Sequence, residues 1–158
     1  MESEIKVREA SAQDVDILAE LWREFMDFHR GLDNFFTRSK DGHERFADFV
    51  RTNIDSSNWL ILVAVDGGKP IGYCMATIMD YPPVLEIEQF GFIQDIAVAE
   101  SHRGKGVGTL LFKRVESWLK ERGIGRIELQ VASTNEASQA FWKQLGFGDF
   151  LNRLAKNL

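Results

Sequence analysis

Cysteine and proline are scarce in this sequence, and their scarcity limits which crosslinks and linkers the chain can contain. The chain contains one cysteine, Cys74, so no disulfide can form within it, which is typical of a protein in a reducing compartment. Its three prolines and 13 glycines are not gathered into a linker, and the sequence has no repeat or low-complexity segment. We therefore interpret residues 1–158 as a single domain, an ordinary length for one hydrophobic core.

A long apolar segment and an excess of positive charge are also missing. The longest unbroken apolar run, Trp59 to Val65, is too short to cross a bilayer. The first residues, Met1 to Glu4, are acidic and lack the basic and apolar parts of a signal peptide, so we expect a cytoplasmic protein with no membrane partner. Because 24 acidic residues outnumber 19 basic ones and give a net charge of -5, we expect no nucleic-acid partner.

The spacing of apolar residues predicts alternating strands and helices. A helical pattern begins after Ser11 to Asp14, which resembles a capping box, and Gly31 to Asn34 is expected to end that helix. Asp66 to Lys69 has the glycines of a hairpin turn. The predicted elements are a strand at 5–7, helices at 12–29 and 41–54, strands at 59–65, 71–79 and 88–98, a helix at 107–122, a strand at 127–131, a helix at 135–145 and a strand at 147–154. This order predicts a mixed α/β (α+β) fold with hairpins early and a βαβ unit late.

Three alternating glycines form the most informative motif. The segment Gly104-Lys105-Gly106-Val107-Gly108 follows a predicted strand and opens a predicted helix. Backbone N–H groups in such a turn can bind a phosphate, and glycine lets the ligand approach without a Cβ in the way. Arg103 adds a guanidinium that can bind phosphate through two parallel hydrogen bonds. The motif lacks the Gly-Lys-Ser/Thr of a Walker loop and comes too late in the chain for a dinucleotide fingerprint, so we interpret it as an anion-binding turn.

The sequence on both sides of this turn resembles the GNAT superfamily of N-acetyltransferases. Arg103 to Gly108 is similar to the family's pyrophosphate motif, Gln/Arg-x-x-Gly-x-Gly/Ala, and Ile93 to Val98 is similar to its central strand. Asn135 to Phe147 resembles its second cofactor segment, including the Gly-Phe end. The resemblance covers nearly the whole chain and implies a mostly antiparallel central sheet flanked by helices. It also implies an enzyme that moves an acetyl group from acetyl-CoA to a primary amine of a small molecule or protein by direct transfer.

Residues that bind the cofactor are implied by the same resemblance. Backbone groups of residues 96–98 would bind the pantetheine arm, and one of their N–H groups would stabilise the oxyanion of the tetrahedral intermediate. Asn135 would bond the pantetheine arm, although it is also placed to cap a helix. The implied cofactor-binding residues are Ile96, Ala97, Val98, Arg103, Gly104, Lys105, Gly106, Val107, Gly108, Thr109, Asn135, Ser138 and Phe141.

The chain departs from the family at both positions that commonly move protons. Many members have a tyrosine as general acid where this chain has Trp142, whose indole N–H is a very poor acid. Tyr73 or Tyr81 could replace it, or the thiolate could leave unprotonated, since the pKa of a thiol lies not far above neutral. Several relatives have a glutamate where this chain has Gln94, so our first choice of general base is Glu88. The other candidates are Glu86, Asp95 and Glu128.

The acceptor site is expected between the first two helices and the Pro82-Pro83 connection. Aromatic rings mixed with carboxylates suit an amine with an apolar body, because both attract cations. The predicted substrate-binding residues are Phe28, Asp33, Tyr81 and Glu86, within a wider aromatic and acidic group that includes Phe25, His29, Phe35 and Phe36. The three histidines and the cysteine show no metal-ligand spacing, so we expect no metal.

Two other interpretations remain open from the sequence. The protein could be a non-catalytic acyl-CoA-binding sensor or partner module, or it could use another acyl donor such as succinyl- or propionyl-CoA. Residues 147–158 would form an edge strand able to pair with a second copy, and this predicts a homodimer.

Overall fold

The structure, a computed structural model, describes residues 4–158, so most of the acidic N-terminal segment considered above lies outside it. Its strands are β1 (Ile5–Glu9), β2 (Trp59–Asp66), β3 (Lys69–Asp80), β4 (Gln89–Val98) and β5 (Ile127–Leu129). Its α-helices are α1 (Val15–Leu32), α2 (Gly42–Asn53), α3 (Val107–Glu121) and α4 (Glu136–Gln144). Three short 3-10 turns are η1 (Ala12–Asp14), η2 (Asn34–Phe36) and η3 (Glu100–His102).

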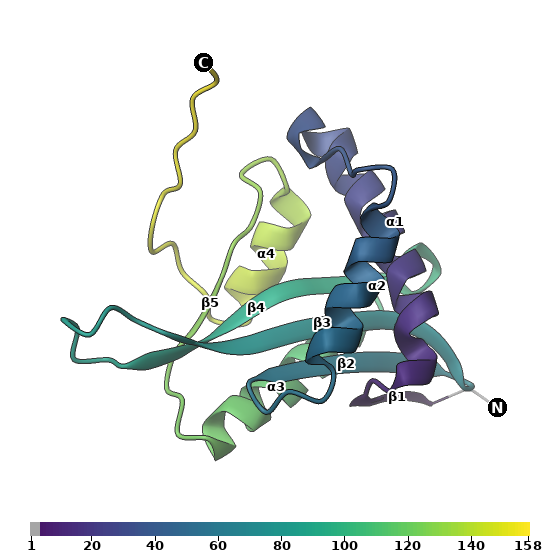
Figure 1. Ribbon diagram of the computed structural model, residues 1–158, viewed down its shortest axis with the longest axis horizontal. Coiled ribbons are helices and arrows are strands. Elements are labelled where there is room, and N and C mark those ends of the chain that lie inside the picture. Colours follow the sequence, from purple (N-terminus) through teal and green to yellow (C-terminus); the bar gives the residue numbers. More distant parts are fainter. Residues whose placement is uncertain (1–3) are drawn as a thin grey trace.

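The described strands form one sheet in the order β1-β2-β3-β4-β5. Neighbouring strands pair antiparallel except β4 and β5, which are parallel. Figure 1 shows α1 and α2 covering one face of the sheet, while side chains of α3 and α4 pack on the other. The mixed, mostly antiparallel sheet flanked by helices is therefore confirmed.

Alternation along β2 and most of β3 divides the core into two layers. Leu62 and Cys74 are fully buried on the α3 side of the sheet. Val63 and Tyr73, one residue away on each strand, are fully buried on the side of α1 and α2. Because both faces are apolar, β2 and β3 read as nearly continuous hydrophobic runs.

The first long helix begins as predicted and ends later than predicted. The backbone N–H of Ser11 donates to Asp14 Oδ2 at 2.7 Å, which confirms the capping box. Gly31 does not break α1, which continues to Leu32. The break comes at Asp33, whose side chain accepts a hydrogen bond from the N–H of Phe35 at 2.8 Å and so starts η2.

The predicted final strand at 147–154 is wrong, because the structure shows no strand or helix there. A strand there would need β5 as its neighbour, and β5 is short, since it pairs with β4 over three residues only. The last segment instead runs away from the sheet, as the yellow trace in Figure 1 shows. Within it Leu151 and Leu154 are exposed, and the ring of Phe150 lies 4.3 Å from the Arg126 guanidinium.

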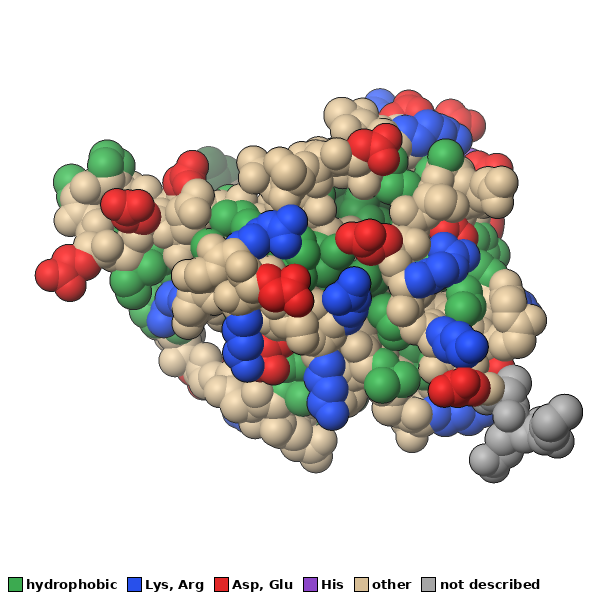
Figure 2. Space-filling view, turned by 90° about the horizontal axis from the view of Figure 1, so that it is seen from below, with side chains coloured by type: hydrophobic (Ala, Val, Ile, Leu, Met, Phe, Trp, Pro, Cys, Tyr) green, Lys and Arg blue, Asp and Glu red, His purple; other side chains and the backbone are tan. Residues whose placement is uncertain are grey.

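The surface carries mixed charge on the face shown in Figure 2. There Lys and Arg side chains alternate with Asp and Glu rather than forming a patch of one sign. Among residues 4–158, no helix is long and apolar enough to cross a membrane.

Candidate active site

A cavity opens where β4 and β5 part. The two strands pair from Gly91 and Ile127 as far as Ile93 and Leu129, and no further pairing follows in the described chain. At the same point Gln94 is an extra residue on β4, because Ile93 pairs with Ala76 and Asp95 with Met75. Such a bulge bends a strand and increases its twist, which carries β4 away from β5. The resulting cavity has a volume of about 240 Å³ and is lined by β4, the residues after β5, and helices α1 and α4.

Many of the predicted cofactor residues meet in this cavity. They line its wall from the end of β4 and from the start of α4 and include Ile96, Ala97, Val98, Arg103, Asn135 and Ser138. Beyond Ile93 the outer edge of β4 has no β5 partner, so its backbone groups can pair with an extended ligand. One of these backbone groups, the carbonyl oxygen of Val98, already accepts a hydrogen bond from Arg103 Nε at 3.0 Å.

The glycine turn after η3 has the conformation of an anion-binding nest. Gly104 and Gly106 have φ of 73° and 80°, a left-handed region that favours glycine. A Cβ built on either residue would meet no atom within 4 Å, so the space in front of both is open. Gly106 is also the N-cap of α3, which places the first N–H groups of that helix beside the turn.

The remaining residues of the motif have different positions. Lys105 is exposed and Thr109 is half-buried in the first turn of α3. The side chain of Val107 is buried in the core, so only its backbone is available to a ligand. A Cβ on Gly108 would lie 3.0 Å from Phe141 Cζ, and its small size therefore accommodates that ring.

A polar chain anchors the turn to the rest of the sheet. His102 Nε2 lies 2.9 Å from Asp66 Oδ2 at the end of β2, and His102 Nδ1 lies 2.8 Å from Ser101 Oγ. Immediately after it, the Arg103 guanidinium lies 5.4 Å from the centre of the Phe28 ring on α1. The turn is therefore tied to both β2 and α1.

Helix α4 supplies an amide and an indole to the cavity. Asn135 Oδ1 accepts from the N–H of Ser138 at 3.1 Å, so the amide nitrogen is the group that can donate to a ligand. Trp142 lines the cavity but is only 4% exposed, and its ring lies edge-on to Phe112 and Phe147 at 5.8 and 5.2 Å. Phe141 packs on Trp142 and Gly108 outside the cavity lining.

One carboxylate of β4 faces the cavity in an apolar environment. Burial raises the pKa of Asp95 from its ordinary value of 3.8 to about 6, although the hydrogen bond from Tyr73 opposes this shift. The Tyr73 hydroxyl donates to Asp95 Oδ2 at 3.4 Å. Burial also raises the pKa of Tyr73 well above its usual value, so this phenol stays protonated. Neither tyrosine of the described chain lines the cavity.

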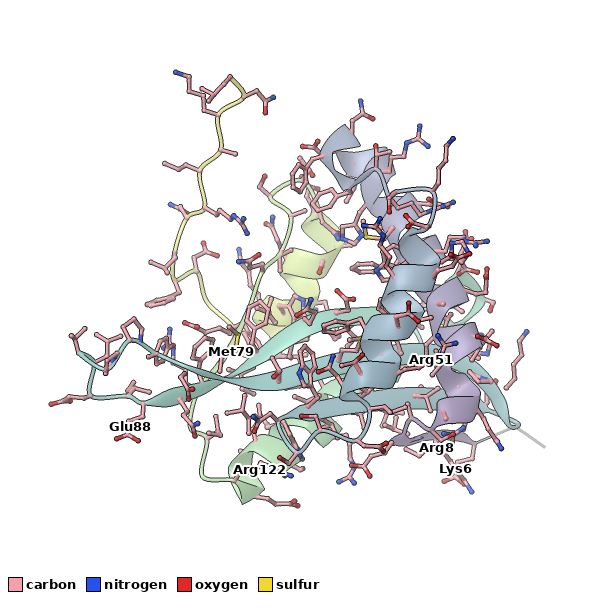
Figure 3. The ribbon with its side chains drawn as sticks, viewed as in Figure 1. Lys6, Arg8, Arg51, Met79, Glu88 and Arg122 are labelled. Atoms are coloured by element: carbon pink, nitrogen blue, oxygen red, sulfur yellow. The ribbon has the colours of Figure 1, made fainter. Side chains whose placement is uncertain are left out.

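Four predicted site residues lie elsewhere. Glu86 and Glu88 are exposed on the connection between β3 and β4, and Figure 3 shows Glu88 near the protruding end of that hairpin. Tyr81 stacks on Phe90 at 4.2 Å, and its hydroxyl accepts from Arg126 Nε at 3.0 Å. Asp33 caps η2 instead of lining the cavity. Of the four residues predicted to bind the acceptor, Phe28 lines the cavity, as do Phe25 and His29 of the wider predicted group.

Glu24 was missed by the sequence analysis although it lines the cavity. It lies four residues before Phe28, so the two side chains share one face of α1. The four-residue spacing could therefore have identified Glu24 from the sequence, once Phe28 was predicted to bind the substrate. No group of three or more metal-binding side chains is found in the described part of the chain.

The fold and site together define a class of protein. The sheet parts at a bulge, and a glycine turn with the conformation of an anion-binding nest leads into a helix beside an exposed strand edge that can pair with an extended ligand. A profile of the acetyltransferase (GNAT) family matches residues 16–147. The chain belongs to this family, and the family resemblance seen in the sequence is confirmed.

Individual relatives and solved structures agree with this membership. An uncharacterised N-acetyltransferase of Methanocaldococcus jannaschii is 26% identical over 141 residues, which are 89% of this chain, and the chain spans 59% of that relative. An aminoglycoside N(6')-acetyltransferase type 1 of Acinetobacter haemolyticus is 32% identical over 56% of this chain and 61% of its own. A mutant protein of Bacillus halodurans has a TM-score of 0.84 and 27% identity, covering 97% of this chain and 99% of that one. A predicted acetyltransferase of Clostridium acetobutylicum, solved with acetyl-CoA, shares the fold with a TM-score of 0.79 and 19% identity, over 98% and 96% of the two chains.

Proposed function

We propose that this protein is an N-acetyltransferase that moves the acetyl group of acetyl-CoA to a primary amine by direct transfer. The observation that carries the proposal is the cavity between β4 and β5, which adjoins the glycine turn and contains the Asp95 carboxylate. The pyrophosphate would lie on the turn at Gly104 and Gly106, where the space is open. The pantetheine arm would follow the unpaired edge of β4, with Asn135 on its other side.

The chemistry requires the amine and the thioester to meet in the cavity. The ammonium form of the acceptor first loses one proton to solvent, and the neutral amine nitrogen then attacks the carbonyl carbon and forms the C–N bond. The oxyanion accepts a hydrogen bond from a backbone N–H of residues 96–98. The C–S bond then breaks, and its electron pair leaves with the sulfur of coenzyme A. The thiolate leaves without a tyrosine donor, because the described tyrosines lie outside the cavity lining.

Asp95 is the residue that we assign as general base. It takes the proton from the attacking nitrogen, which becomes acidic as the C–N bond forms. A carboxyl with a pKa of about 6 is largely ionised at neutral pH and still basic enough to accept that proton. The earlier choice, Glu88, is exposed and does not line the cavity, so its placement favours Asp95.

A direct assay tests the proposal. Purified protein is mixed with acetyl-CoA and a panel of primary amines, and the released thiol and the N-acetyl product are measured together. We expect both in equal amounts with at least one amine. A protein that does not bind coenzyme A at all, measured by calorimetry, would contradict the cofactor assignment as well as the activity.

A second function has one observation in its favour. Trp142 occupies the position where many family members have the acid, and it is packed between aromatic rings. A non-catalytic acyl-CoA sensor would have no need of an acid or a base. Tight binding of acetyl-CoA without turnover on any amine would support the sensor and overturn the enzyme.

Relatives in the comparison indicate small-molecule amines as acceptors. The Acinetobacter haemolyticus relative is named for acetylation of aminoglycosides, which are small polyamines. We therefore propose a small-molecule amine ahead of a protein amine. The acyl donor is tested in the same assay by replacing acetyl-CoA with succinyl- or propionyl-CoA.

A further inference from the structure

One face of α1 forms the cavity wall that is not used by the proposed cofactor. Leu21, Glu24, Phe25 and Phe28 all line the cavity and recur at helical spacing. Phe28 is 44% exposed, although a phenyl ring is usually buried. A large ring held at the mouth of a cavity is available for contact with a ligand.

Other aromatic rings continue this wall. The His29 ring lies 4.2 Å from Phe25, 5.5 Å from Phe28 and 5.3 Å from Phe36, measured between ring centres. His29 Nδ1 donates to the carbonyl oxygen of Phe25 at 2.8 Å, which fixes the imidazole ring. Asp33 caps η2 and so positions Phe36, which explains the acid there without a direct contact to substrate.

The charges in the cavity lining are few. Besides the His29 imidazole, the ionisable side chains among the described lining residues are those of Glu24, Asp95 and Arg103. The Arg103 guanidinium lies over the Phe28 ring, so this ring already interacts with a cation. A pyrophosphate on the adjacent turn would give Arg103 a stronger partner and leave the Phe28 ring to another group.

We infer that the acceptor is a primary amine with one positive charge and an aromatic body. Its ammonium group binds near Glu24 and Asp95, and its ring packs on Phe25 and Phe28. A polycation such as an aminoglycoside would need more carboxylates than the two in the lining, and Arg103 would repel it. This inference rests on the proposed function, because it names the substrate class of the same site.

A comparison of four amines tests the substrate class. Phenylethylamine, butylamine, spermidine and kanamycin are assayed with acetyl-CoA by thiol release. We expect kcat/KM for phenylethylamine to exceed that for butylamine by about tenfold or more, because a buried aromatic pair adds to the apolar contact. Spermidine or kanamycin as the best substrate would overturn the inference while leaving acetyl transfer intact. No turnover with any amine would overturn both proposals.

Two pairs of variants separate recognition from a general loss of structure. Phe28→Ala should lower kcat/KM about tenfold more for phenylethylamine than for butylamine. Its matched control is Phe49→Ala, because Phe49 is 37% exposed on α2, contacts Trp59 edge-on at 5.2 Å and lies outside the cavity lining. Equal losses for both amines in Phe28→Ala would contradict a role in recognition.

The ammonium contact is tested on the same helix. Glu24→Gln should raise KM about tenfold for both phenylethylamine and butylamine, because both carry the ammonium group. Glu20→Gln is the control, since Glu20 lies one turn earlier, pairs with Arg23 at 3.5 Å and does not line the cavity. An unchanged KM in Glu24→Gln would remove Glu24 from the acceptor site.

Discussion

Replacing Asp95 with asparagine should stabilise the protein at neutral pH while removing most of its activity. The shift of the Asp95 pKa from 3.8 to about 6 means that the native state holds this proton more tightly than the unfolded chain does. Well below pH 3.8, the ordinary pKa of the group, both states are protonated and the carboxyl costs nothing. As the pH rises through the interval between the two pKa values, the unfolded state loses its proton first and the free energy of unfolding falls. Above the folded-state pKa, the free energy of unfolding stays about 3 kcal/mol lower than it would be without this shift.

Urea denaturation of the wild type and Asp95→Asn from about pH 4 to 7.5 measures this difference. The other groups titrate in both proteins, so the gap between the two curves should widen by about 2.5 kcal/mol in favour of the variant over that range. Turnover of the variant should fall by about 100-fold or more, as expected for the loss of a general base. The wild-type kcat/KM should decline below about pH 6, the pKa of the carboxyl.

Glu88→Gln is the control for this prediction, because Glu88 is exposed and does not line the cavity. It should keep the turnover of the wild type. Parallel stability curves for the wild type and Asp95→Asn would refute the account of Asp95 as a desolvated carboxylate. Normal turnover in Asp95→Asn with reduced turnover in Glu88→Gln would return the base to Glu88.

Three further measurements address the turn and the assay. Gly106→Ala should weaken coenzyme A binding about tenfold or more, measured by calorimetry. Gly123→Ala is the control: Gly123 has a φ of 73°, close to the 80° of Gly106, so this variant should carry similar backbone strain and bind coenzyme A normally. Equal affinities of the two variants would exclude the turn as the pyrophosphate site. His102→Ala should raise KM for acetyl-CoA about threefold to tenfold with little change in kcat, because the substitution removes the contact that holds the glycine turn to Asp66. A loss confined to kcat would contradict this positioning role of His102. Cys74 should not react with a thiol reagent in the native protein, because it is fully buried and burial raises the pKa of its thiol. Labelling before unfolding would contradict its burial. If native Cys74 does not react, the thiol measured in the transferase assay comes from coenzyme A alone.

The sequence predicted the fold well because its strongest signals are local. The capping box at Ser11 and Asp14, and the glycines at 67 and 68 with positive φ, fix their turns through adjacent atoms. The last strand was predicted on local pattern alone, and it failed because a strand also needs a partner edge. Strand β5 offers only three paired residues, so Phe147 and the residues after it form no ladder.

The candidate site was harder to predict, because it depends on which segments meet. The alternating glycines identified the turn, and the family resemblance identified Asn135; the turn follows the end of β4, and Asn135 lines the cavity at the start of α4. The acceptor residues at Tyr81 and Glu86 were expected from the family's connection, but in this chain that hairpin protrudes beyond the site. Glu24 was missed because an isolated acid on an amphipathic helix looks like a solvated residue.

The bulge at Gln94 explains why alternation along β4 pointed to Glu88, a carboxylate outside the cavity lining. In a regular strand, Ile93 and Asp95 would share a face. The extra residue reverses this order, so Ile93 packs on the α3 side while Asp95 reaches Tyr73 on the side of α1. The same residue ends the pairing with β5 and opens the cavity. One insertion therefore creates the space that we propose for the thioester and turns a carboxylate toward the helix that we expect to hold the amine.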